Sequence, residues 1–443
     1  MQLKHALRFD APLQAAFVGA GGKSAAMFQL ARQLEGPVLL TTTTHLSLAQ
    51  AAQVDHHIIV EPGASLPALD ASALPPVTLL TGSSEGQRVT ALHPAALAAL
   101  SEFARQHQLP LLVEADGSRQ LALKAPASHE PAIPDFVDLV VVLAGLSALG
   151  QLLDETRVHR PDRYAALAET QLGEPITRQH LARVLAHPEG GLKNIPAAAR
   201  RVVLLNHVET DNLSAAANRI AASLLPSFDS VLAASLAAEN QEDAVSAAYE
   251  PVAGVLLAAG ASGRLGEPKQ LLDWKGTPFV RQVAQTALAA GLSPLVVVTG
   301  AFLDKVAAAL EGLPFQLVHN PAWETGQASS VKAGLAALPP RTGAAFFLVV
   351  DQPQLPVALL EAARAEHART LASIIAPQVD GSRSNPVLFD QRTFSDFAAI
   401  EGDVGGRAIF ARHRVVWLPW LDASLAIDVD TPEDYNRLLN YAG

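Results

Sequence analysis

Residues 255–269 read VLLAAGASGRLGEPK and have the residue types needed to hold a nucleoside triphosphate. The apolar start predicts a buried parallel strand that stops at two alanines and Gly260. Gly260, Gly263 and Gly266 carry no Cβ, so the loop could lie flat against a ligand. Arg264 and Lys269 then supply the positive charge that a triphosphate needs.

Acidic residues follow two later apolar runs. Asp351 ends AAFFLVVD, and parallel sheets bind ligands beyond the carboxyl ends of their strands. A carboxylate there is a suitable ligand for Mg²⁺, which keeps phosphate oxygens and waters as its other ligands, although Asp351 could instead cap the next turn. In LAIDVDTPEDYNRLL, TPED predicts a helix start, preceded by Asp428 and Asp430. These two alternate in a strand-like run, so we expect opposite faces, with one of the two facing the metal.

These motifs resemble the molybdenum cofactor nucleotidyltransferases over residues 252–440. The matching segments are LAAGASGRLGEPK, VHNPAWETGQASSVKAGL, VVDQPQLP, GSRSNPVLF, GDVGGRAIF and DVDTPEDY. The resemblance implies a nucleotide on the first loop, a metal at the aspartates and a pterin on the later loops. The implied nucleotide-binding residues are Leu257, Ala258, Ala259, Gly260, Gly263, Gly266, Ser329 and Ser330, and the implied pterin-side residues are Asn385, Pro386, Gly402, Asp403 and Arg407. Lys269, Arg264 and Asp351 are the expected catalytic residues, and Asp351, Asp428 and Asp430 the expected metal ligands.

The substrate also follows from the resemblance. LAAG, rather than LAGG, goes with the cytidylyltransferases of that family and therefore implies CTP. A phosphate of molybdopterin would attack the α-phosphorus of CTP and release pyrophosphate, with in-line positioning and charge neutralisation by Lys269, Arg264 and Mg²⁺. The chain departs from the family's pattern at two positions of the segments implied to bind the pterin: Gln327 stands where the family usually has methionine, and Ser384 where it usually has glycine. Two alternatives stay open: transfer onto a sugar or alditol phosphate, and a non-catalytic chaperone that binds the finished cofactor.

A second glycine loop lies in AAFVGAGGKSAAMF at residues 15–28. The expected phosphate-binding residues there are Gly19, Gly21, Gly22, Lys23 and Ser24. Backbone N–H groups and a helix N-terminus would hold the phosphate, with Lys23 on the outer phosphates and Ser24 on Mg²⁺. The standard P-loop has glycine where this chain has Phe17, so the loop is shortened or degenerate. A tight strand-to-helix turn and a site for the phosphate of the pterin itself are the alternatives.

Further polar residues support a site in this half. Glu114 and Asp116 follow the run LPLLV and resemble the magnesium-binding strand end of a P-loop protein. His45 and His129 could join the site or be ordinary surface or core histidines. GAGGKS, TTTTH, EADGS, KAP, HEP and GLSALG together resemble the YqeC-like family of selenium-dependent hydroxylase accessory proteins over about residues 10–235. The resemblance implies that this half binds a nucleotide, ATP or GTP, and helps to mature molybdenum hydroxylases, with a hydroxylase apoprotein as partner.

Two series of short apolar runs alternating with helix-length segments predict an α/β protein of two domains. We expect a P-loop-like domain over 1–240 and a Rossmann-like nucleotidyltransferase domain over 252–443, joined within 240–251. Of the 443 residues, 32 are Lys or Arg and 43 Asp or Glu, and the net charge of −11 argues against nucleic acid and membrane partners. The absence of cysteine excludes disulfides and thiolate chemistry. No secretory or membrane-spanning segment is evident, so we expect a cytoplasmic protein.

Overall fold

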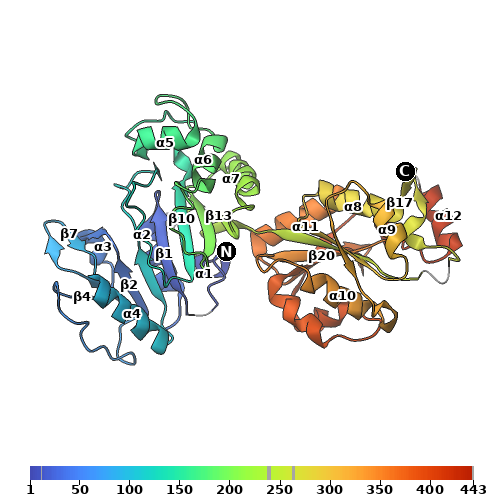
Figure 1. Ribbon diagram of the computed structural model, residues 1–443, viewed down its shortest axis with the longest axis horizontal. Helices are drawn as coiled ribbons and strands as arrows, with labels where there is room; N and C mark the ends of the chain where they lie inside the picture. The colour runs from blue at the N-terminus through green and yellow to red at the C-terminus, as the bar shows by residue number, and fades with distance from the viewer. Residues whose placement is uncertain (11, 237–240, 262–264, 442–443) are drawn as a thin grey trace. The chain divides into compact units, whose positions relative to one another are not determined.

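A computed structural model describes residues 1–10, 12–236, 241–261 and 265–441 of the chain. It divides into two compact units, Met1–Tyr249 and Glu250–Gly443. Each unit is built on a sheet with parallel strands at its centre and with helices packed against it (Figure 1), which confirms the predicted α/β class. Among the described residues, no helix is both long and apolar enough to cross a membrane.

The N-terminal unit contains a nine-stranded sheet. In spatial order its strands are β14 (Val245–Tyr249), β13 (Ser230–Ala234), β12 (Arg200–Asn206), β10 (Leu139–Gly145), β1 (Gln14–Gly19), β8 (Leu111–Glu114), β2 (Val38–Thr42), β5 (Val77–Thr81) and β4 (His56–Ile59). All neighbours are parallel except β13 and β14. Every apolar run that predicted a strand in this half forms one. The segment 240–251, expected to join two domains, contains β14, so the N-terminal unit continues to Tyr249.

Seven α-helices accompany this sheet in the described part of the unit: α1 (Leu3–Ala6), α2 (Lys23–Gln33), α3 (Leu48–Ala51), α4 (Pro94–Gln106), α5 (Pro161–Ala168), α6 (Arg178–Ala186) and α7 (Asp211–Leu224). Alternate strand residues, such as Ala16 and Val18 of β1, share one apolar layer with α4, α5, α6 and α7. Smaller pieces are β3 (His45–Ser47), β6 (Ser84–Glu85), β7 (Arg88–Thr90), β9 (Leu123–Lys124), β11 (Val158–His159), η1 (Leu146–Ala148) and η2 (Gln241–Asp243). β11 pairs with β9 outside the main sheet.

The C-terminal sheet is mixed. Its order is β19 (Gln316–His319), β18 (Leu295–Thr299), β15 (Val252–Ala258), β20 (Ala344–Val349), β23 (Val387–Asp390), β21 (Ile374–Val379) and β22 (Ser382–Arg383), with β24 (Val415–Pro419) also paired to β21. β19, β18, β15 and β20 are mutually parallel, whereas β23 runs antiparallel to both β20 and β21. The predicted apolar runs form strands here too, and β23 is an additional strand within the segment NPVLF.

Helices cover both faces of this sheet. α8 (Phe279–Ala289), α9 (Leu303–Ala309) and α11 (Val357–Thr370) contribute to one apolar layer, and α10 (Gln327–Ala336) contributes to the other, as Figure 1 shows for α8, α11 and α10 around β20. α12 (Pro432–Asn440) begins as predicted, because Thr431 caps it and Asp434 completes a capping box. The remaining elements are β16 (Asp273–Trp274), β17 (Thr277–Pro278), η3 (Lys269–Leu271), η4 (Trp323–Thr325), η5 (Gln391–Ala399), η6 (Gly406–Arg412) and η7 (Ala423–Ala426).

Candidate functional site

Lys269 lies between two carboxylates at the carboxyl edge of the C-terminal sheet. Its Nζ is 2.6 Å from Asp430 Oδ1 and 3.3 Å from Asp351 Oδ2. Burial alone would lower the pKa of Lys269, but the two carboxylates outweigh burial and raise it. The ammonium group of Lys269 therefore stays protonated. This predicted catalytic lysine lies beside Asp351 and Asp430, two of the predicted metal-binding aspartates.

Strand pairing explains why Asp351 is here. β15 and β20 are parallel with Leu257 opposite Val349, so the loop after β15 and the residues after Val349 emerge at the same edge. Asp351 is held in a buried environment, which raises its pKa against the opposing charge of Lys269. Its Oδ1 atom is buried and has no hydrogen-bond partner among the described residues. A buried carboxylate oxygen in that state is suited to a cation.

Asp428 adds a third carboxylate. Gln352 Nε2 donates a 2.8 Å hydrogen bond to Asp428 Oδ1, yet burial, followed by the charge of Asp351, raises the pKa of Asp428 to about 6. Among the described residues no group of three His, Asp or Glu side chains is arranged to hold a metal by itself. Mg²⁺ needs only one or two protein carboxylates, because phosphate oxygens and waters complete its coordination, so these residues fit such an ion.

The expectation that Asp428 and Asp430 point to opposite faces is wrong. Residues two apart in an extended segment point to the same side, and here Ile427 and Val429 are buried while both aspartates line the same cavity of about 390 Å³. Asn385, Asp403 and Arg407, three of the predicted pterin-side residues, line this cavity as well. The structure thus brings the later loops and the two aspartates to one cavity.

The other two pterin-side residues do not line the cavity. Pro386 precedes β23, and the Gly402 carbonyl accepts a 3.1 Å hydrogen bond from the Ala328 N–H at the start of α10. A Cβ on Gly326 would lie 2.3 Å from the Gly402 carbonyl carbon, so this glycine allows the close approach of the 402–407 loop to α10. Gly402 therefore positions the loop that carries Asp403 and Arg407.

The strand-end loop that the sequence predicts to bind a nucleotide is described in part. Leu257 lines the 390 Å³ cavity, while the Ala258 and Gly260 carbonyls accept hydrogen bonds of 3.1 and 2.7 Å from Gln270 Nε2. The Ala259 carbonyl accepts from the Ala301 N–H at 3.1 Å. Gly266 has φ +77°, a conformation that favours glycine. Gly263 and Arg264 lie outside the described residues.

Ser329 and Ser330 are engaged in protein contacts. Their hydroxyl oxygens accept hydrogen bonds of 2.8 and 3.0 Å from Asn320 Nδ2, and neither lines the cavity. These bonds join the first turn of α10 to the end of β19, since Asn320 directly follows that strand. Both serines therefore join α10 to the end of β19 and do not face the cavity.

Sequence reasoning missed several residues that position the others. Gln270 anchors the strand-end loop and Gln352 orients Asp428, and each directly follows a residue that the motifs did single out. Arg383 lines the 390 Å³ cavity with its guanidinium 5.4 Å from the Phe410 ring. Gln327 also lines this cavity, and Ser384, the other departure, donates a 2.8 Å hydrogen bond to the Leu425 carbonyl.

The glycine loop of the N-terminal unit is packed closely on its own fold. The N–H groups of Gly19, Ala20 and Gly21 donate to Asp116 Oδ2, the Leu143 carbonyl and the Leu121 carbonyl at 2.9, 2.9 and 3.0 Å. Asn206 Nδ2 donates to the Gly21 carbonyl at 2.7 Å. Of the predicted phosphate-binding residues, Gly21, Gly22, Lys23 and Ser24 line a cavity of about 990 Å³, and Gly19 does not.

Lys23 is held in place by three groups. Its Nζ donates to the Gly19 carbonyl at 2.8 Å and to Ser118 Oγ at 2.9 Å, and it lies 3.2 Å from Asp116 Oδ1. Asp116 also pairs with Lys124 at 3.0 Å and does not line the cavity. Asp116, one of the two acids predicted to bind magnesium, therefore pairs with Lys23 and Lys124 behind the glycine loop.

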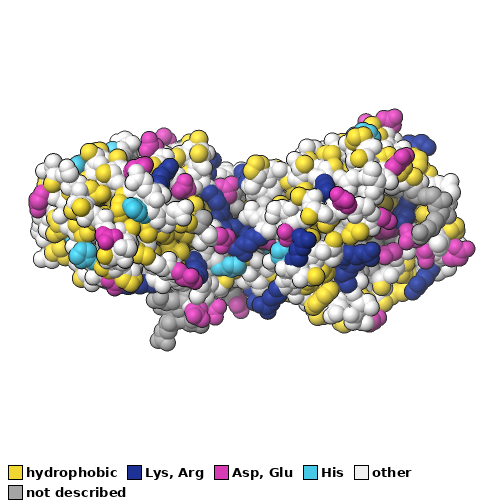
Figure 2. All heavy atoms as spheres, turned by 90° about the horizontal axis from the view of Figure 1, so that it is seen from below, with side chains coloured by type: hydrophobic (Ala, Val, Ile, Leu, Met, Phe, Trp, Pro, Cys, Tyr) yellow, Lys and Arg dark blue, Asp and Glu magenta, His cyan; other side chains and the backbone are white. Residues whose placement is uncertain are grey.

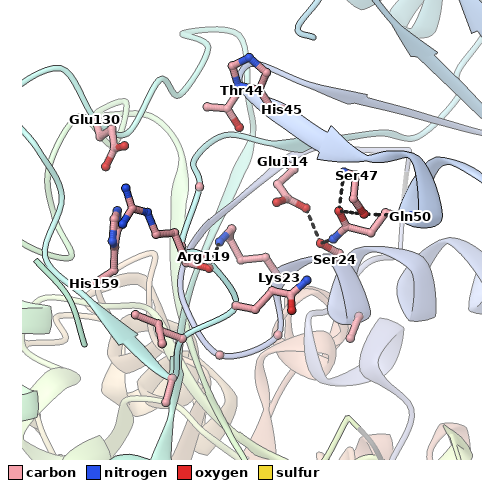
Figure 3. Close-up of a pocket in the computed structure, with 18 of the residues that line it drawn as sticks. Lys23, Ser24, Thr44, His45, Ser47, Gln50, Glu114, Arg119, Glu130 and His159 are labelled. Carbon is pink, nitrogen blue, oxygen red and sulfur yellow. Dashed lines mark hydrogen bonds between the residues drawn. The ribbon is translucent and has the colours of Figure 1, made fainter. Parts of the chain in front are cut away.

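Glu114 faces the 990 Å³ cavity. It accepts a 2.7 Å hydrogen bond from Ser24 Oγ, and burial raises its pKa although Lys23 opposes this. Gln50 Nε2 donates to Ser24 Oγ at 2.5 Å, and Figure 3 shows Ser24, Ser47, Gln50 and Glu114 gathered on one side of the pocket, with Glu130 and His159 on the other. His45, His129 and His207 also line this cavity.

Comparison with known proteins covers both halves. Residues 254–416 match the family model described as a MobA-like NTP transferase domain, and residues 15–162 match the model described as YqeC protein. The uncharacterised protein YqeC of Escherichia coli is 34% identical over 202 residues, spanning 44% of this chain and 76% of that protein. Nicotine blue oxidoreductase of Paenarthrobacter nicotinovorans is 36% identical over 203 residues, 42% of this chain and 96% of that protein.

A third relative is the purine catabolism protein PucB of Bacillus subtilis, which is 31% identical over 199 residues, 42% of this chain and 94% of that protein. By these matches the chain belongs to the MobA-like NTP transferase family through its C-terminal half and to the YqeC family through its N-terminal half, and it is a nucleotidyltransferase.

Proposed function

We propose that the C-terminal half transfers CMP from CTP to molybdopterin or the molybdenum cofactor and releases pyrophosphate. The observation that carries the proposal is Lys269 between Asp351 and Asp430, next to a cavity that Asp430 shares with Asp403 and Arg407. A cation for the triphosphate and a separate acceptor cavity thus adjoin at one sheet edge.

The reaction needs positioning and charge neutralisation. A phosphate oxygen of the acceptor forms a bond to the α-phosphorus of CTP as the bond to the bridging oxygen of the β-phosphate breaks, and pyrophosphate leaves with that electron pair. Lys269 would exchange its aspartate contacts for the phosphate oxygens of CTP and compensate their charge. Arg407, which lines the cavity, would hold the phosphate of the acceptor in line for attack.

Asp351, with Asp428 or Asp430, would hold Mg²⁺. The ion, when bound, would neutralise the triphosphate and the leaving pyrophosphate. The buried Oδ1 of Asp351 and the raised pKa of Asp428 support this assignment, since a divalent cation relieves the repulsion among the carboxylates.

For the N-terminal half we propose a nucleotide-binding domain that helps to mature or deliver the cofactor to a molybdenum hydroxylase. Gly22, Lys23 and Ser24 start α2 at the wall of the 990 Å³ cavity, so the N-terminus of this helix and Ser24 Oγ would hold the phosphates of ATP or GTP. Figure 2 shows Lys and Arg side chains lying among Asp and Glu side chains on the face in view.

One assay tests the C-terminal proposal. Pyrophosphate release by the full chain is measured with each of the four ribonucleoside triphosphates and Mg²⁺, with and without molybdopterin. We expect release only with CTP and molybdopterin together. Release with a sugar or alditol phosphate in place of the pterin would identify another acceptor, and no release with any acceptor would favour a cofactor-binding chaperone.

A further inference from the structure

The N-terminal cavity has a charge opposite to that of the chain. Five Lys and Arg side chains line it against two Glu, whereas the chain as a whole has a net charge of −11. The lining cations are Lys23, Arg88, Arg119, Arg157 and Arg160, and the lining acids are Glu114 and Glu130. A concave site that reverses the overall charge favours anionic ligands.

Part of this positive charge is neutralised within the fold. Glu130 accepts hydrogen bonds of 2.8 and 2.9 Å from the two terminal nitrogens of Arg160 and lies 2.8 Å from Lys124 Nζ. Burial would raise the pKa of Glu130, but the bonds from Arg160 and Lys124 lower it to about 2. Glu130 is thus permanently ionised and compensates Arg160.

Arg119 and Arg157 are not held in such an ion pair; the charge of Arg157 contributes, after the hydrogen bonds from Thr156, to lowering the pKa of Asp154. Throughout the described ranges of the chain, neither guanidinium makes a side-chain hydrogen bond or salt bridge, and each residue is exposed at the cavity wall. The Arg157 carbonyl accepts a 3.2 Å hydrogen bond from the Leu123 N–H, and β11, which starts at the next residue, pairs with β9. This pairing brings the segment of Arg157 alongside the loop that contains Arg119.

The pKa of His159 reflects the positive charge around this part of the cavity. Its pKa is lowered by burial and then by the charges of Arg160, Lys124 and Arg119, so its ring is neutral at pH 7 and has one donor and one acceptor nitrogen. In Figure 3 His159 and Glu130 lie across the pocket from Ser24 and Glu114, with Lys23 and Arg119 between the two groups. Arg119 therefore lies on the side of His159, apart from the end of the cavity where Ser24 would hold a phosphate.

We propose that Arg119, Arg157 and His159 form a second oxyanion subsite, which binds the phosphate or carboxylate of a small molecule while Lys23 and Ser24 hold a different phosphate. A cavity of about 990 Å³ is at the upper end of ordinary ligand pockets and has room for both groups. Planar guanidinium groups bind either oxyanion through paired N–H donors. The subsite is independent of the cytidylyl transfer proposed for the C-terminal half.

The test is binding of radiolabelled inorganic phosphate to the full chain by equilibrium dialysis. The double variant Arg119→Gln/Arg157→Gln is compared with Lys23→Ala and with the control Arg219→Gln, an exposed arginine of α7 that does not line the cavity. We expect the double variant to lose one phosphate, or to bind it at least tenfold more weakly. Lys23→Ala should weaken a different phosphate, and Arg219→Gln should match wild type. Phosphate that binds in the C-terminal half should be the same for wild type and the three variants, so differences among the four proteins report on the N-terminal cavity.

Crystals of the full chain soaked in tungstate locate the bound anions. Tungstate near both Ser24 and Arg119 is expected, and tungstate near Ser24 alone overturns the proposal. Phosphate binding by the double variant equal to wild type also overturns it. Competition by succinate separates the ligand classes: displacement of the arginine-dependent phosphate indicates a carboxylate ligand, and persistence indicates a phosphate ligand. Pyrophosphate release from CTP, measured on the same proteins, reports separately on the C-terminal reaction.

Discussion

Replacing Asp351 by Asn removes one negative charge with almost no change of shape. Asp351 Oδ2 is 3.3 Å from Lys269 Nζ, while Oδ1 is buried and has no hydrogen-bond partner among the described residues. If Oδ1 binds Mg²⁺, the substitution weakens the ion at the triphosphate. Loss of one such electrostatic contact commonly costs on the order of 100-fold in turnover, which is about 2.7 kcal/mol of activation free energy.

The same substitution should not destabilise the fold. Because burial raises the pKa of Asp351, the ionised form is disfavoured in the folded chain, and this residue's contribution to stability is present at acid pH and lost as the pH rises through its folded pKa. At neutral pH a neutral Asn removes that penalty, and Lys269 keeps its 2.6 Å contact with Asp430. We therefore expect an unfolding free energy equal to or above that of wild type, with turnover reduced at least 100-fold.

The assay pairs pyrophosphate release at saturating Mg²⁺, CTP and molybdopterin with urea unfolding of the same protein. Asp304→Asn is the matched control, because Asp304 is exposed in the first turn of α9 and belongs to neither cavity. The control should keep its turnover. Turnover of Asp351→Asn within about threefold of wild type would refute the metal role, and a large loss of stability would refute the electrostatic reasoning.

Four further predictions use the same proteins and assays. Ala259→Gly should loosen the preference for CTP over GTP without abolishing transfer, and equal use of both nucleotides by wild type would contradict the LAAG analogy. Lys23→Ala should weaken ATP or GTP binding in calorimetry and leave CTP-dependent transfer unchanged; absence of any binding to wild type at millimolar nucleotide would contradict the P-loop interpretation. Glu130→Gln should lower the unfolding free energy by about 3 kcal/mol or more, since Lys124 and Arg160 lose a buried partner, whereas the exposed control Glu189→Gln should change it by about 1 kcal/mol or less. The apparent affinity for Mg²⁺ in transfer should fall as the pH drops through about 6, where Asp428 gains a proton; a constant affinity from pH 5 to 8 would exclude Asp428 as a ligand.

The fold was largely predictable because its central strands are short apolar runs that stop at glycines and acids. The N-terminal sheet and the parallel strands β15, β18, β19 and β20 all follow this pattern. β14 was missed because VSAAY lacks a strongly apolar run, and its pairing with β13 became visible only in three dimensions. β23 begins directly after Asn385 and Pro386, which the resemblance assigned to pterin binding, and it lies between β20 and β21 and pairs antiparallel with both.

The site was predictable where one motif holds the residues and unpredictable where contacts join distant segments. Lys269 and Asp351 could be placed at one sheet edge from strand ends alone, since both follow parallel strands. That Asp430, 161 positions from Lys269, would make its closest contact could not be derived from spacing. The prediction that Asp428 and Asp430 face opposite sides was wrong because residues two apart in an extended segment share a side, and the buried Ile427 and Val429 occupy the other side. The helix start at TPED, which depends only on local capping, was predicted correctly.

Both halves place a lysine next to aspartate before any ligand arrives. Lys23 is nearly buried between Asp116, Ser118 and the Gly19 carbonyl, whereas Lys269 is held by Asp351 and Asp430 with more exposure. Asp351 and Asp430 outweigh burial and raise the pKa of Lys269, so they preserve the charge that a phosphate needs. A phosphate can bind Lys269 by replacing Asp351 and Asp430, and a metal would then bind these carboxylates. A phosphate can bind Lys23 only if Lys23 gives up its contacts with the Gly19 carbonyl, Ser118 and Asp116. We therefore expect a ligand of the N-terminal cavity to depend more on α2, Ser24, Arg119 and Arg157 than on Lys23.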